Sequence, residues 1–441
     1  MANVVTLEKP INDVSEDDVR AFSKTRNEPE WVLRLRLKAL KYLKRGRSSP
    51  YIDPLMADVT FKMIIDSYEK PTLDSDEALK IAKSLGIPEE EIKLIASGFS
   101  VNVDNRLIKY YLDYLKAKGV IIAPMEKAIK KYGIIRNYLF KVMNLNANRR
   151  TAYHALLWSG GVFIYVPPNT KIAQPLYGLF LIGKEGLSQT EHTLIIVDEN
   201  SSIYWIEGCT TPLPLTYAVH LGGLEALVKR SAELRVVSIN NWLGDVHHRP
   251  VKKVKVYDEG FAELTSIAFR SKTSYTTPTI ELEGKGAKGV IQSIGVYRDR
   301  QKVLTAPLIK LIGSETSGQI LNRTVVMDEA FEIFKGTLRS EQSSRNSFGH
   351  MSCNTLVLSE KAISKAIPSL DVRSRFSELS HEASIGRVSY EKLYYLSLLG
   401  LSEEESTQLI VNGFLNPIVS KLPYDLQVEV KKIISLALKA H

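Results

Sequence analysis

Residues 278–327 read PTIELEGKGAKGVIQSIGVYRDRQKVLTAPLIKLIGSETSGQILNRTVVM. Short runs rich in β-branched residues, such as PTIELEG, GVIQSIGVY and TAPLIKLIG, are separated here by Gly, Asn, Asp or Ser, which is the pattern of successive strands. No amphipathic run of helical length lies between them, which disfavours the alternation of strands and helices in a doubly wound sheet. The stretch therefore predicts consecutive β-strands joined by tight turns.

The same pattern extends from about Thr151 to Arg375. Further runs of this kind are FIYV, TLIIVDE, SIYWIEG, ELRVVSI, PVKKVKVY, ELTSIAF, GQILNRTVVM and FEIFKGTLR. A sandwich, a barrel and a coiled solenoid of strands each accommodate many short strands. Near-even spacing, with loose repetition about every two dozen residues, favours a β-helix among the three. The predicted fold class is thus mainly β with helical ends.

Three glycines in this zone imitate a nucleotide-binding fingerprint. Gly284, Gly286 and Gly289 satisfy G-x-G-x-x-G and follow a predicted strand. The fingerprint requires a helix next, whose N-terminus receives the pyrophosphate, but VIQSIGVY follows and has the pattern of a strand. We therefore interpret the glycines as a tight turn between strands.

Helical patterns flank the β zone on both sides. Before it, Ser15 and Asp18 form a capping pattern, Pro29 is expected to start a second helix, and residues 74–98 and 105–120 follow the same periodicity. After it, Ser402 and Glu405 form another capping box. These patterns predict three domains: N-terminal helices over 1–150, the β core over 151–375, and C-terminal helices over 376–441, whose apolar face suits docking of another protein.

Composition and charge narrow the class of protein. Of the 441 residues, 44% are hydrophobic and 24% charged, which is ordinary for a globular protein. The net charge of +9 is densest in residues 33–47 and 248–256, where apolar residues recur regularly, so a solvated basic face is expected rather than a nucleic-acid groove. No run has membrane-span length and no signal peptide is evident, so we expect a cytoplasmic protein with no membrane or nucleic-acid partner.

Only two cysteines occur, Cys209 in WIEGCTTP and Cys353 in HMSCNTLVL. They cannot build a disulfide framework, and no C-x-x-C is present for a metal site within one segment. Most free cysteines are small buried hydrophobes. Cys209, however, lies between Gly208 and Thr210 at a predicted strand end, where its sulfur is expected to be accessible, and Cys353 is expected at the start of a strand.

Potential metal ligands follow Cys353 at His381 and Glu382. Thiolate, imidazole and carboxylate are ligand types that iron and zinc accept. Adjacent strand residues point to opposite faces, so His381 and Glu382 are not expected to bind one metal through the same face. His381 is expected to be a core residue, and His247 and His248 surface residues. One chain then offers too few ligands for an iron–sulfur cluster, and a second subunit is expected to supply the rest.

The sequence resembles the SufB/SufD family of the Suf iron–sulfur cluster assembly system, and within it the SufB scaffold subunits, over nearly its whole length. The resemblance is carried by NEPEW (Asn27 to Trp31), WSGGVFIYVP (Trp158 to Pro167), TLIIVDE, IEGCT (Ile206 to Thr210), NNW (Asn240 to Trp242), SC (Ser352, Cys353), HEAS (His381 to Ser384) and LSEEESTQLIVNGF (Leu401 to Phe414). It implies a right-handed parallel β-helix core.

The same resemblance implies roles for single residues. Cys209 matches the position that accepts persulfide sulfur from a cysteine desulfurase or a sulfur carrier, and Cys353 with Glu382 matches the pair that holds the nascent cluster, with His381 as a possible further metal ligand. Asn240, Trp242 and Lys252 match positions where the family has residues suggested to line a sulfur path inside the β-helix.

Partners and cofactors are implied in the same way. The cluster lies at an interface with a SufD-like subunit or a second copy of the chain, the C-terminal helices dock a SufC-type ATPase, and recipient apo iron–sulfur proteins take the product. Reduced flavin is an implied electron donor in the complex. The chain lacks a G-x-x-x-x-G-K-[ST] loop, so ATP is expected only on the partner, and the chain is expected to be a scaffold and not an enzyme.

The pattern of the family is not kept everywhere. Leu181 and Gly183 stand where bacterial members commonly carry Arg and Asn along the proposed path, and Ser380 replaces an acidic residue. Within the family, the alternative is a SufD-like structural subunit that accepts no sulfur. From other classes, a carbohydrate-acting β-helix enzyme and a basic nucleic-acid-binding protein are the remaining alternatives.

Overall fold

The computed structural model describes residues 13–44 and 114–439, apart from 183, 184, 187, 212 and 213, together with two short strands at 9–10 and 62–63. The predicted helices over 74–98 and over most of 105–120 lie outside the described residues. The two short strands, β1 (Lys9–Pro10) and β2 (Lys62–Met63), pair antiparallel.

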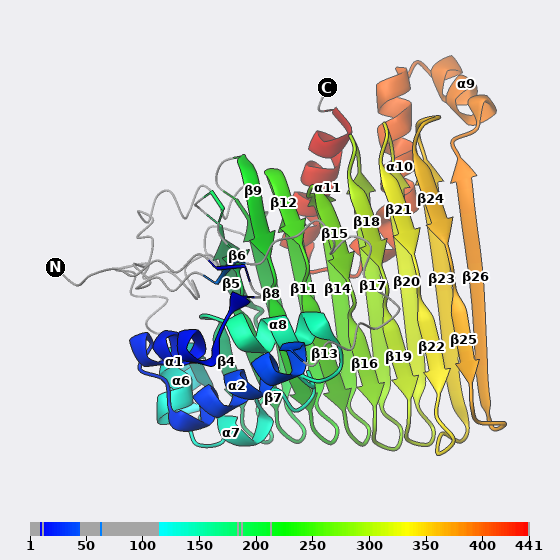
Figure 1. Cartoon of the computed structure of the whole chain (residues 1–441). Helices are drawn as coiled ribbons and strands as arrows, with labels where there is room; N and C mark the ends of the chain where they lie inside the picture. Colours follow the sequence, from blue (N-terminus) through cyan, green and yellow to red (C-terminus); the bar gives the residue numbers. More distant parts are fainter. Residues whose placement is uncertain are drawn as a thin grey trace.

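Three parallel sheets wind around a common interior as a β-helix (Figure 1), as the sequence predicted. The first sheet contains β3 (Ile121–Pro124), β4 (Val162–Val166), β7 (His192–Val197), β10 (Gly223–Val228), β13 (Val251–Val256), β16 (Thr279–Leu282), β19 (Leu308–Leu311), β22 (Thr337–Ser340) and β25 (Ser369–Val372). In this sheet β3 pairs antiparallel with β4, and the strands from β4 onwards are parallel.

The other two sheets complete each turn of the β-helix. The second sheet contains β5 (Leu176–Leu181), β8 (Ser202–Thr210), β11 (Glu233–Asn241), β14 (Phe261–Arg270), β17 (Lys288–Tyr297), β20 (Ser317–Val326), β23 (Ser347–Val357) and β26 (Ser377–Arg387). The third contains β6 (Ser188–Gln189), β9 (Leu215–His220), β12 (Gly244–His248), β15 (Thr273–Thr276), β18 (Lys302–Thr305), β21 (Phe331–Phe334) and β24 (Ile363–Ala366). Most side-chain hydrogen bonds between neighbouring turns join residues 24 to 34 positions apart.

Stacked apolar side chains hold the turns together. In the first sheet Val254 pairs with Ile280, Ile280 with Ile309 and Ile309 with Leu338, and all four side chains are fully buried in the interior. Strand residues alternate between two faces, so this inward column requires an apolar residue at every second position. The alternating pattern of the sequence therefore determines which side chains fill the β-helix.

One corner of the β-helix repeats a left-handed backbone residue in successive turns. Ser231, Glu259, Gly286 and Glu315 have φ between 53° and 68°, and each donates its N–H to a carbonyl of the next turn. Gly286 thus occupies the corner position that Glu259 and Glu315 take in neighbouring turns. Strand β17 follows directly, which confirms that the G-x-G-x-x-G sequence is a turn between strands and does not open a helix.

Helices near the N-terminus cover one outer face of the first sheet. They are α1 (Glu16–Thr25), α2 (Glu30–Lys44), α6 (Met125–Lys131), α7 (Ile135–Tyr138) and α8 (Arg149–Leu157). The capping box of Ser15 and Asp18 is confirmed, and α2 begins directly after Pro29, as expected. Glu225, fully buried on β10, fixes the segment after α7 because it accepts the backbone N–H groups of residues 140, 141 and 142 at 2.6–2.7 Å.

The densest basic segments are not simply solvated, contrary to the expectation. Arg36 on α2 is fully buried, pairs with Glu28 at 2.6 Å and donates to the carbonyls of Leu156 and Trp158. In the second basic segment, Arg249 is also fully buried. These guanidinium groups hold elements together inside the molecule, because a buried charge is tolerated only when it is paired and hydrogen-bonded.

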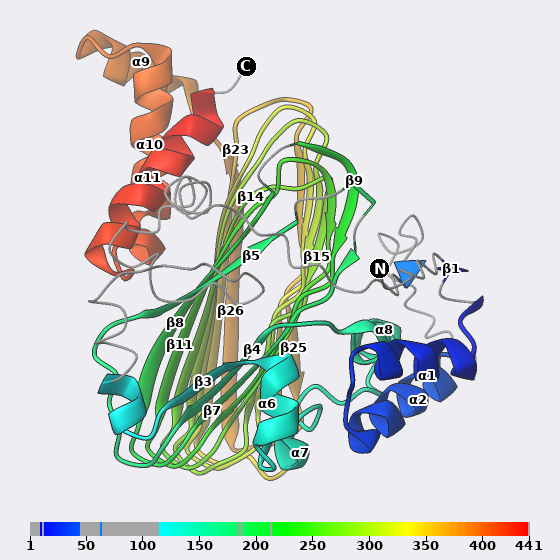
Figure 2. The same cartoon turned by 90° about the vertical axis from the view of Figure 1, so that its left-hand side faces the viewer.

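Three helices follow the last strand: α9 (Tyr390–Leu398), α10 (Glu403–Val419) and α11 (Tyr424–Lys439). The pair α10 and α11 packs against the outer face of the second sheet, on a different side of the β-helix from α1 and α2 (Figure 2). Helix α9 has no buried residue and exposes Tyr390, Tyr395 and Leu398. The ends of the regular elements differ from the expected limits, since α8 continues to Leu157 and β26 continues to Arg387.

None of the helices in the described part of the chain is both long enough and apolar enough to span a membrane.

The N-cap of α10 gives a direct stability prediction. Ser402 accepts the backbone N–H of Glu405, and the Glu405 carboxylate accepts the N–H of Ser402 at 2.8 Å. We expect Ser402→Ala to lower the free energy of unfolding by about 1 kcal/mol, because the backbone N–H of Glu405 loses its partner and the Glu405 carboxylate loses the Ser402 hydroxyl. Urea denaturation measures this change. Ser420→Ala, at the exposed other end of α10, is the matched control, and an equal loss there would contradict the capping explanation.

Candidate functional site

Cys209 lies inside the β-helix, near the end of β8. Trp205, Glu207 and Cys209 alternate along this strand and face the interior, where Phe180 of β5 and Asn240 of β11 flank the cysteine in register. The cysteine is only 2% exposed. The expectation of an accessible sulfur was therefore wrong. The thiol lies near a strand end, as expected, but its side chain points into the closed interior of the β-helix.

A buried ion pair lies one inward position before the cysteine. Lys252 of β13 reaches across the interior and contacts the Glu207 carboxylate and the Ser238 hydroxyl, and Ser238 also donates to Glu207 at 2.8 Å. Trp205 Nε1 donates to the same carboxylate at 3.2 Å. Burial alone would raise the pKa of Glu207, but Lys252 and these hydrogen bonds outweigh it, so the net pKa is lowered and the carboxylate is charged.

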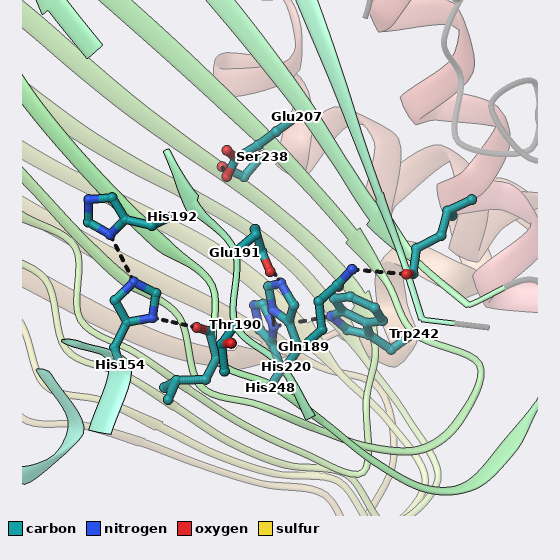
Figure 3. Close-up of polar contacts among 12 residues, drawn as sticks. His154, Gln189, Thr190, Glu191, His192, Glu207, His220, Ser238, Trp242 and His248 are labelled. Atoms are coloured by element: carbon teal, nitrogen blue, oxygen red, sulfur yellow. Dashed lines mark hydrogen bonds and ion pairs between the residues drawn. The ribbon is translucent and has the colours of Figure 1, made fainter. Parts of the chain in front are cut away.

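Histidines from the third sheet form the opposite wall. His220 at the end of β9 contacts Glu191 through Nε2 at 2.6 Å and His248 of β12 through Nδ1 at 2.9 Å, and Trp242 donates its indole N–H to His248 Nδ1 at 3.2 Å (Figure 3). Both His247 and His248 are buried, so their expected surface position was wrong. Burial lowers the pKa of His248, and the neighbouring His220 lowers it further, so His248 is neutral.

These walls bring three different metal-binding side chains together. Single ligand atoms of Glu191, Cys209 and His220 lie within 4.8 Å of one another, and all three residues are buried. They line an enclosed cavity of about 10 Å³, together with Glu207, Asn240, His248, Lys252 and their neighbours. We refer to this group around Cys209 as the Cys209 chamber. Asn240, Trp242 and Lys252, singled out from the sequence, all lie in or beside it.

The Cys209 chamber favours the protonated thiol. Burial raises the pKa of Cys209 well above its ordinary value, and the carboxylates of Glu207 and Glu191 raise it further. Lys252 acts in the opposite direction but does not compensate. A thiolate therefore forms here only when another positive charge enters or when a base removes the proton.

Cys353 also faces the interior, but at the other end of the β-helix. It lies in the middle of β23 and not at its start, and it is fully buried, with the Asn322 amide 3.7 Å from its sulfur. Burial raises the pKa of Cys353 to about 12, and the nearby Glu332 contributes in the same direction.

Glu382 and Cys353 lie on neighbouring strands but face opposite sides of the sheet. Cys353 pairs with Ala383 in the interior, whereas Glu382 pairs with Ser352, whose hydroxyl donates to it at 2.6 Å on the outer face. His381 lies on the inward side of β26, and it is exposed, so the expectation of a core residue was wrong. The reason is that β26 is the last strand of its sheet, and no described residue covers its far edge.

A row of polar side chains joins the two ends of the interior. In register along the second sheet, Glu207 pairs with Ser238, and then Ser266, Ser293, Asn322 and Cys353 follow on successive strands. All of them occupy inward positions. The preceding inward positions on the same strands hold apolar residues such as Trp205, Leu264 and Ile320. Buried polar groups are costly unless they are hydrogen-bonded, and Ser238 and Asn322 meet this condition through Glu207 and Cys353.

Comparison with known proteins identifies the class of protein. Residues 180–414 match the model of the SufBD core domain, described as SUF system FeS cluster assembly. A Pyrococcus horikoshii protein named as an iron–sulfur cluster assembly SufBD family protein is 34% identical and covers 99% of each chain. A Staphylococcus aureus protein of the same family name is 32% identical over 99% of this chain and 95% of its own. The chain belongs to the SufBD family.

Membership in the SufBD family places the protein in iron–sulfur cluster assembly. It does not separate a SufB-like from a SufD-like subunit. Leu181, one of the departures from the SufB pattern, does not line the interior of this SufBD chain. Its side chain packs outward, under the C-terminal helices, while Phe180 faces Cys209. Gly183, the other departure, lies outside the described residues.

Several residues of the Cys209 chamber were missed from the sequence. Glu207 was detectable, because it lies two positions before Cys209 and alternation places both on one strand face. Glu191 and His220 gave no such signal, since their meeting with Cys209 depends on how three different sheets close into one turn. The same holds for Ser266, Ser293 and Asn322, whose row exists only through the pairing register.

The thiols of this SufBD chain should react slowly in the folded state. Because the pKa of Cys353 is raised from 9.0 to about 12, its thiolate fraction near neutral pH is about a thousandfold below that of a free cysteine. We expect iodoacetamide to alkylate Cys353 correspondingly more slowly than in the urea-unfolded chain, with a rate that still rises past pH 9.0, measured by peptide mass spectrometry. A rate that levels off near pH 9.0 would contradict the raised pKa.

The same shift sets a sign for stability. The pKa of Cys353 is higher in the folded chain than in the unfolded chain, so the buried thiol leaves the free energy of unfolding unreduced below about pH 9.0. As the pH rises from there towards 12, the unfolded chain ionises first and the free energy of unfolding falls.

Proposed function

We propose that this SufBD chain is an assembly scaffold that accepts persulfide sulfur at Cys209 and builds a transient iron–sulfur cluster beside Cys353. The single observation that supports this most is the inward polar row from Glu207 to Cys353, which connects the surroundings of both cysteines. Iron and sulfide are cargo in this proposal and not resident cofactors.

Sulfur acceptance at Cys209 is a thiol exchange without net oxidation. The Cys209 sulfur attacks the terminal sulfur of a donor persulfide, the new S–S bond forms on Cys209, and the donor leaves as a thiolate that takes up the proton lost by Cys209. His220 and Glu191 are near enough to Cys209 to carry this proton. Because the sulfur is buried, the donor cysteine must enter the end of the interior before the exchange takes place.

Polar residues beyond Cys209 then provide the direction of transfer. Lys252 attracts an anionic sulfur species, and Ser238 with Asn240 offers polar groups on the next strand towards the other end. Ser266, Ser293 and Asn322 continue the row as far as Cys353. Trp242 is fully buried beside His220 and His248, where it restricts the width of the chamber.

The cluster is proposed to form where β26 ends the stack (Figure 1). Cys353 and His381, both on the inward side, would supply a thiolate and an imidazole nitrogen, whereas Glu382 lies on the outer face and would join them only through a shift of β26 on partner binding. Since a cluster takes about four protein ligands, the others come from a second subunit, either a SufD-like chain or another copy. Among the described residues β26 has no neighbour on its outer edge, and exposed Phe348, Val372 and Ile385 nearby suit such a partner.

Partner proteins complete the proposal. The exposed face of α9 and the ends of α10 suit docking of a SufC-type ATPase, so that ATP is bound there and not on this chain. A cysteine desulfurase or a sulfur carrier delivers sulfur, reduced flavin is a candidate electron donor, and apo iron–sulfur proteins receive the cluster in the cytoplasm. The chain itself then has no catalytic turnover.

The test is anaerobic purification of the chain with a co-expressed ATPase partner, with visible absorbance, iron and acid-labile sulfide measured together. We expect a thiolate-to-iron band in the wild type that disappears in Cys353→Ala, because the only thiolate at that end is removed. In Glu382→Ala we expect the band to weaken but persist, because Glu382 faces away from Cys353. Glu341→Ala, a carboxylate on the surface, is the matched control.

A colourless wild type after supply of iron and sulfide would reject the scaffold. The alternative is then a SufD-like subunit that supports the complex without accepting sulfur. One observation favours that alternative: Cys353 and Glu382, the expected pair, face opposite sides of the sheet in the isolated chain.

A further inference from the structure

The hydrogen bonds around His220 determine which of its ring nitrogens carries a proton. An indole N–H can only donate, so His248 Nδ1, which accepts from Trp242 at 3.2 Å, has no proton. The contact between His220 Nδ1 and His248 Nδ1 at 2.9 Å then requires the proton on His220. In a neutral His220 ring this leaves Nε2 with its lone pair free, and Nε2 is the atom that faces Glu191.

Two acceptors therefore meet at His220 Nε2 and Glu191 Oε1, which are 2.6 Å apart. A contact this short is held by a proton shared between the two atoms. A metal ion that bound both atoms at bond lengths of about 2.0–2.2 Å would replace this proton and hold the atoms about 3 Å apart, so a small shift of Glu191 accompanies metal binding. A metal-binding histidine has the same arrangement, since its free nitrogen binds the metal and its other N–H is held by a neighbouring group. His248 and Trp242 provide this outer support here.

Three observations indicate that a metal cation can replace this proton. The Cys209 sulfur lies in the same group, within 4.8 Å of the other ligand atoms. Glu191 Oε2 is buried and has no hydrogen-bond partner among the described residues. The enclosed cavity of about 10 Å³ between these side chains has room for about one water-sized atom, so it can hold an ion or the fourth ligand of one.

Charge balance is also satisfied. A carboxylate and a thiolate carry two negative charges, neutral His220 carries none, and a divalent cation brings the sum to zero. The neighbouring Glu207 and Lys252 already neutralise each other. A neutral metal site avoids the large cost of an isolated charge in a dry interior.

We propose that Glu191, Cys209 and His220 form a binding site for a single divalent thiophilic metal ion inside the β-helix. One carboxylate oxygen, one thiolate sulfur and one imidazole nitrogen leave a fourth position open, as in tetrahedral sites that retain a place for an exchangeable ligand. Binding releases the Cys209 thiol proton and the proton shared by His220 and Glu191. The identification of the natural ion as Fe²⁺ rests on the proposed function, whereas the site itself does not.

The consequence is that Cys209 has two alternative states. With a metal bound, the sulfur is a ligand and its attack on a donor persulfide is slowed; without the metal, it is free to accept sulfur. A sulfur species bound at the open fourth position would contact the metal ion beside Cys209. The site thus controls when Cys209 is available.

The test is an anaerobic titration of the full-length chain with Co²⁺ alone, followed by absorbance. We expect one equivalent to bind with a thiolate-to-cobalt charge-transfer band and the visible bands of a four-coordinate ion. Cys209→Ser should remove the charge-transfer band, and Glu191→Gln and His220→Gln should each weaken binding by at least about tenfold. Glu332→Gln, a buried carboxyl elsewhere in the interior, should leave the titration unchanged.

Circular dichroism checks that the variants fold. A second measurement uses the wild type alone, so it does not depend on the folding of any variant. In the wild type, one equivalent of Zn²⁺ should protect Cys209, but not Cys353, from prolonged alkylation. The site is rejected if no charge-transfer band appears, if the band survives in Cys209→Ser, or if Glu191→Gln and His220→Gln both bind as the wild type does.

This outcome is separable from the proposed function. Sulfur uptake at Cys209 without metal binding would remove the metal site and leave the scaffold proposal intact. Metal binding in a chain that never takes up sulfur would support the metal site and reject the scaffold proposal.

Discussion

Cys209→Ser should lose sulfur uptake completely when the chain is incubated with a cysteine desulfurase, cysteine and any sulfur carrier the desulfurase requires. The wild type should gain the mass of one sulfur atom on the peptide that contains Cys209, and Cys353→Ser should gain it as well. The reason is that only Cys209 is adjacent to a cation, Lys252, and to groups that can take up its proton. Peptide mass spectrometry after trapping of persulfides measures the site and the yield.

The matched comparison is between two thiols of the same chain that are both buried in the same interior. If only burial mattered, both would stay unmodified in the folded chain. Sulfur found first on Cys353, or on neither cysteine with an active desulfurase present, would reject Cys209 as the acceptor. The double variant Cys209→Ser/Cys353→Ser supplies the background.

Lys252→Met should lower the free energy of unfolding by about 3–5 kcal/mol, because it leaves the Glu207 carboxylate buried without a counter-charge. The Glu207 side chain is 7% exposed and that of Lys252 16%, so water screens the pair little. Urea denaturation followed by tryptophan fluorescence is suitable, since Trp205 donates to Glu207 and Trp242 donates to His248, which lines the same cavity as the pair.

Two controls separate this effect from the loss of a long side chain. Glu207→Gln combined with Lys252→Met should recover most of the loss, because no charge then remains buried. Lys272→Met removes a partner of Asp245 from a pair whose side chains are 51% and 47% exposed, and should cost about 1 kcal/mol or less. An equal cost for Lys252→Met and Lys272→Met would show that the interior is open to water.

Lys252→Met should also affect sulfur uptake in the same direction as Cys209→Ser, but less completely. Removal of Lys252 leaves Glu207 and Glu191 as uncompensated negative neighbours of the thiol, so the pKa of Cys209 rises further. Unchanged uptake with a large loss of stability would mean that Lys252 is a structural residue only.

The sequence by itself determined the class of fold and many local features. Alternating apolar residues required strands with one buried face, and the absence of helical runs between them excluded a doubly wound sheet. The caps at Ser15 and Ser402 and the turn at Gly286 were readable, because each depends on a few neighbouring residues. Rare motifs such as IEGCT and HEAS were sufficient for the family, since family membership is carried by local strings of residues.

The tertiary structure alone decided which side chains meet. Glu207 and Lys252 are 45 positions apart and form a pair only because two different sheets close around one interior. Cys209 seemed accessible and is buried, His248 seemed exposed and is buried, and His381 seemed buried and is exposed, since exposure depends on the position of a strand within the stack.

Cys353 and Glu382 were expected to act together, and the register places them on opposite faces of the second sheet. The physical reason is common to all these cases. Strand periodicity fixes alternation along each strand, but the pairing register and the closure of three sheets into one coil fix which face is inside and which residues are neighbours.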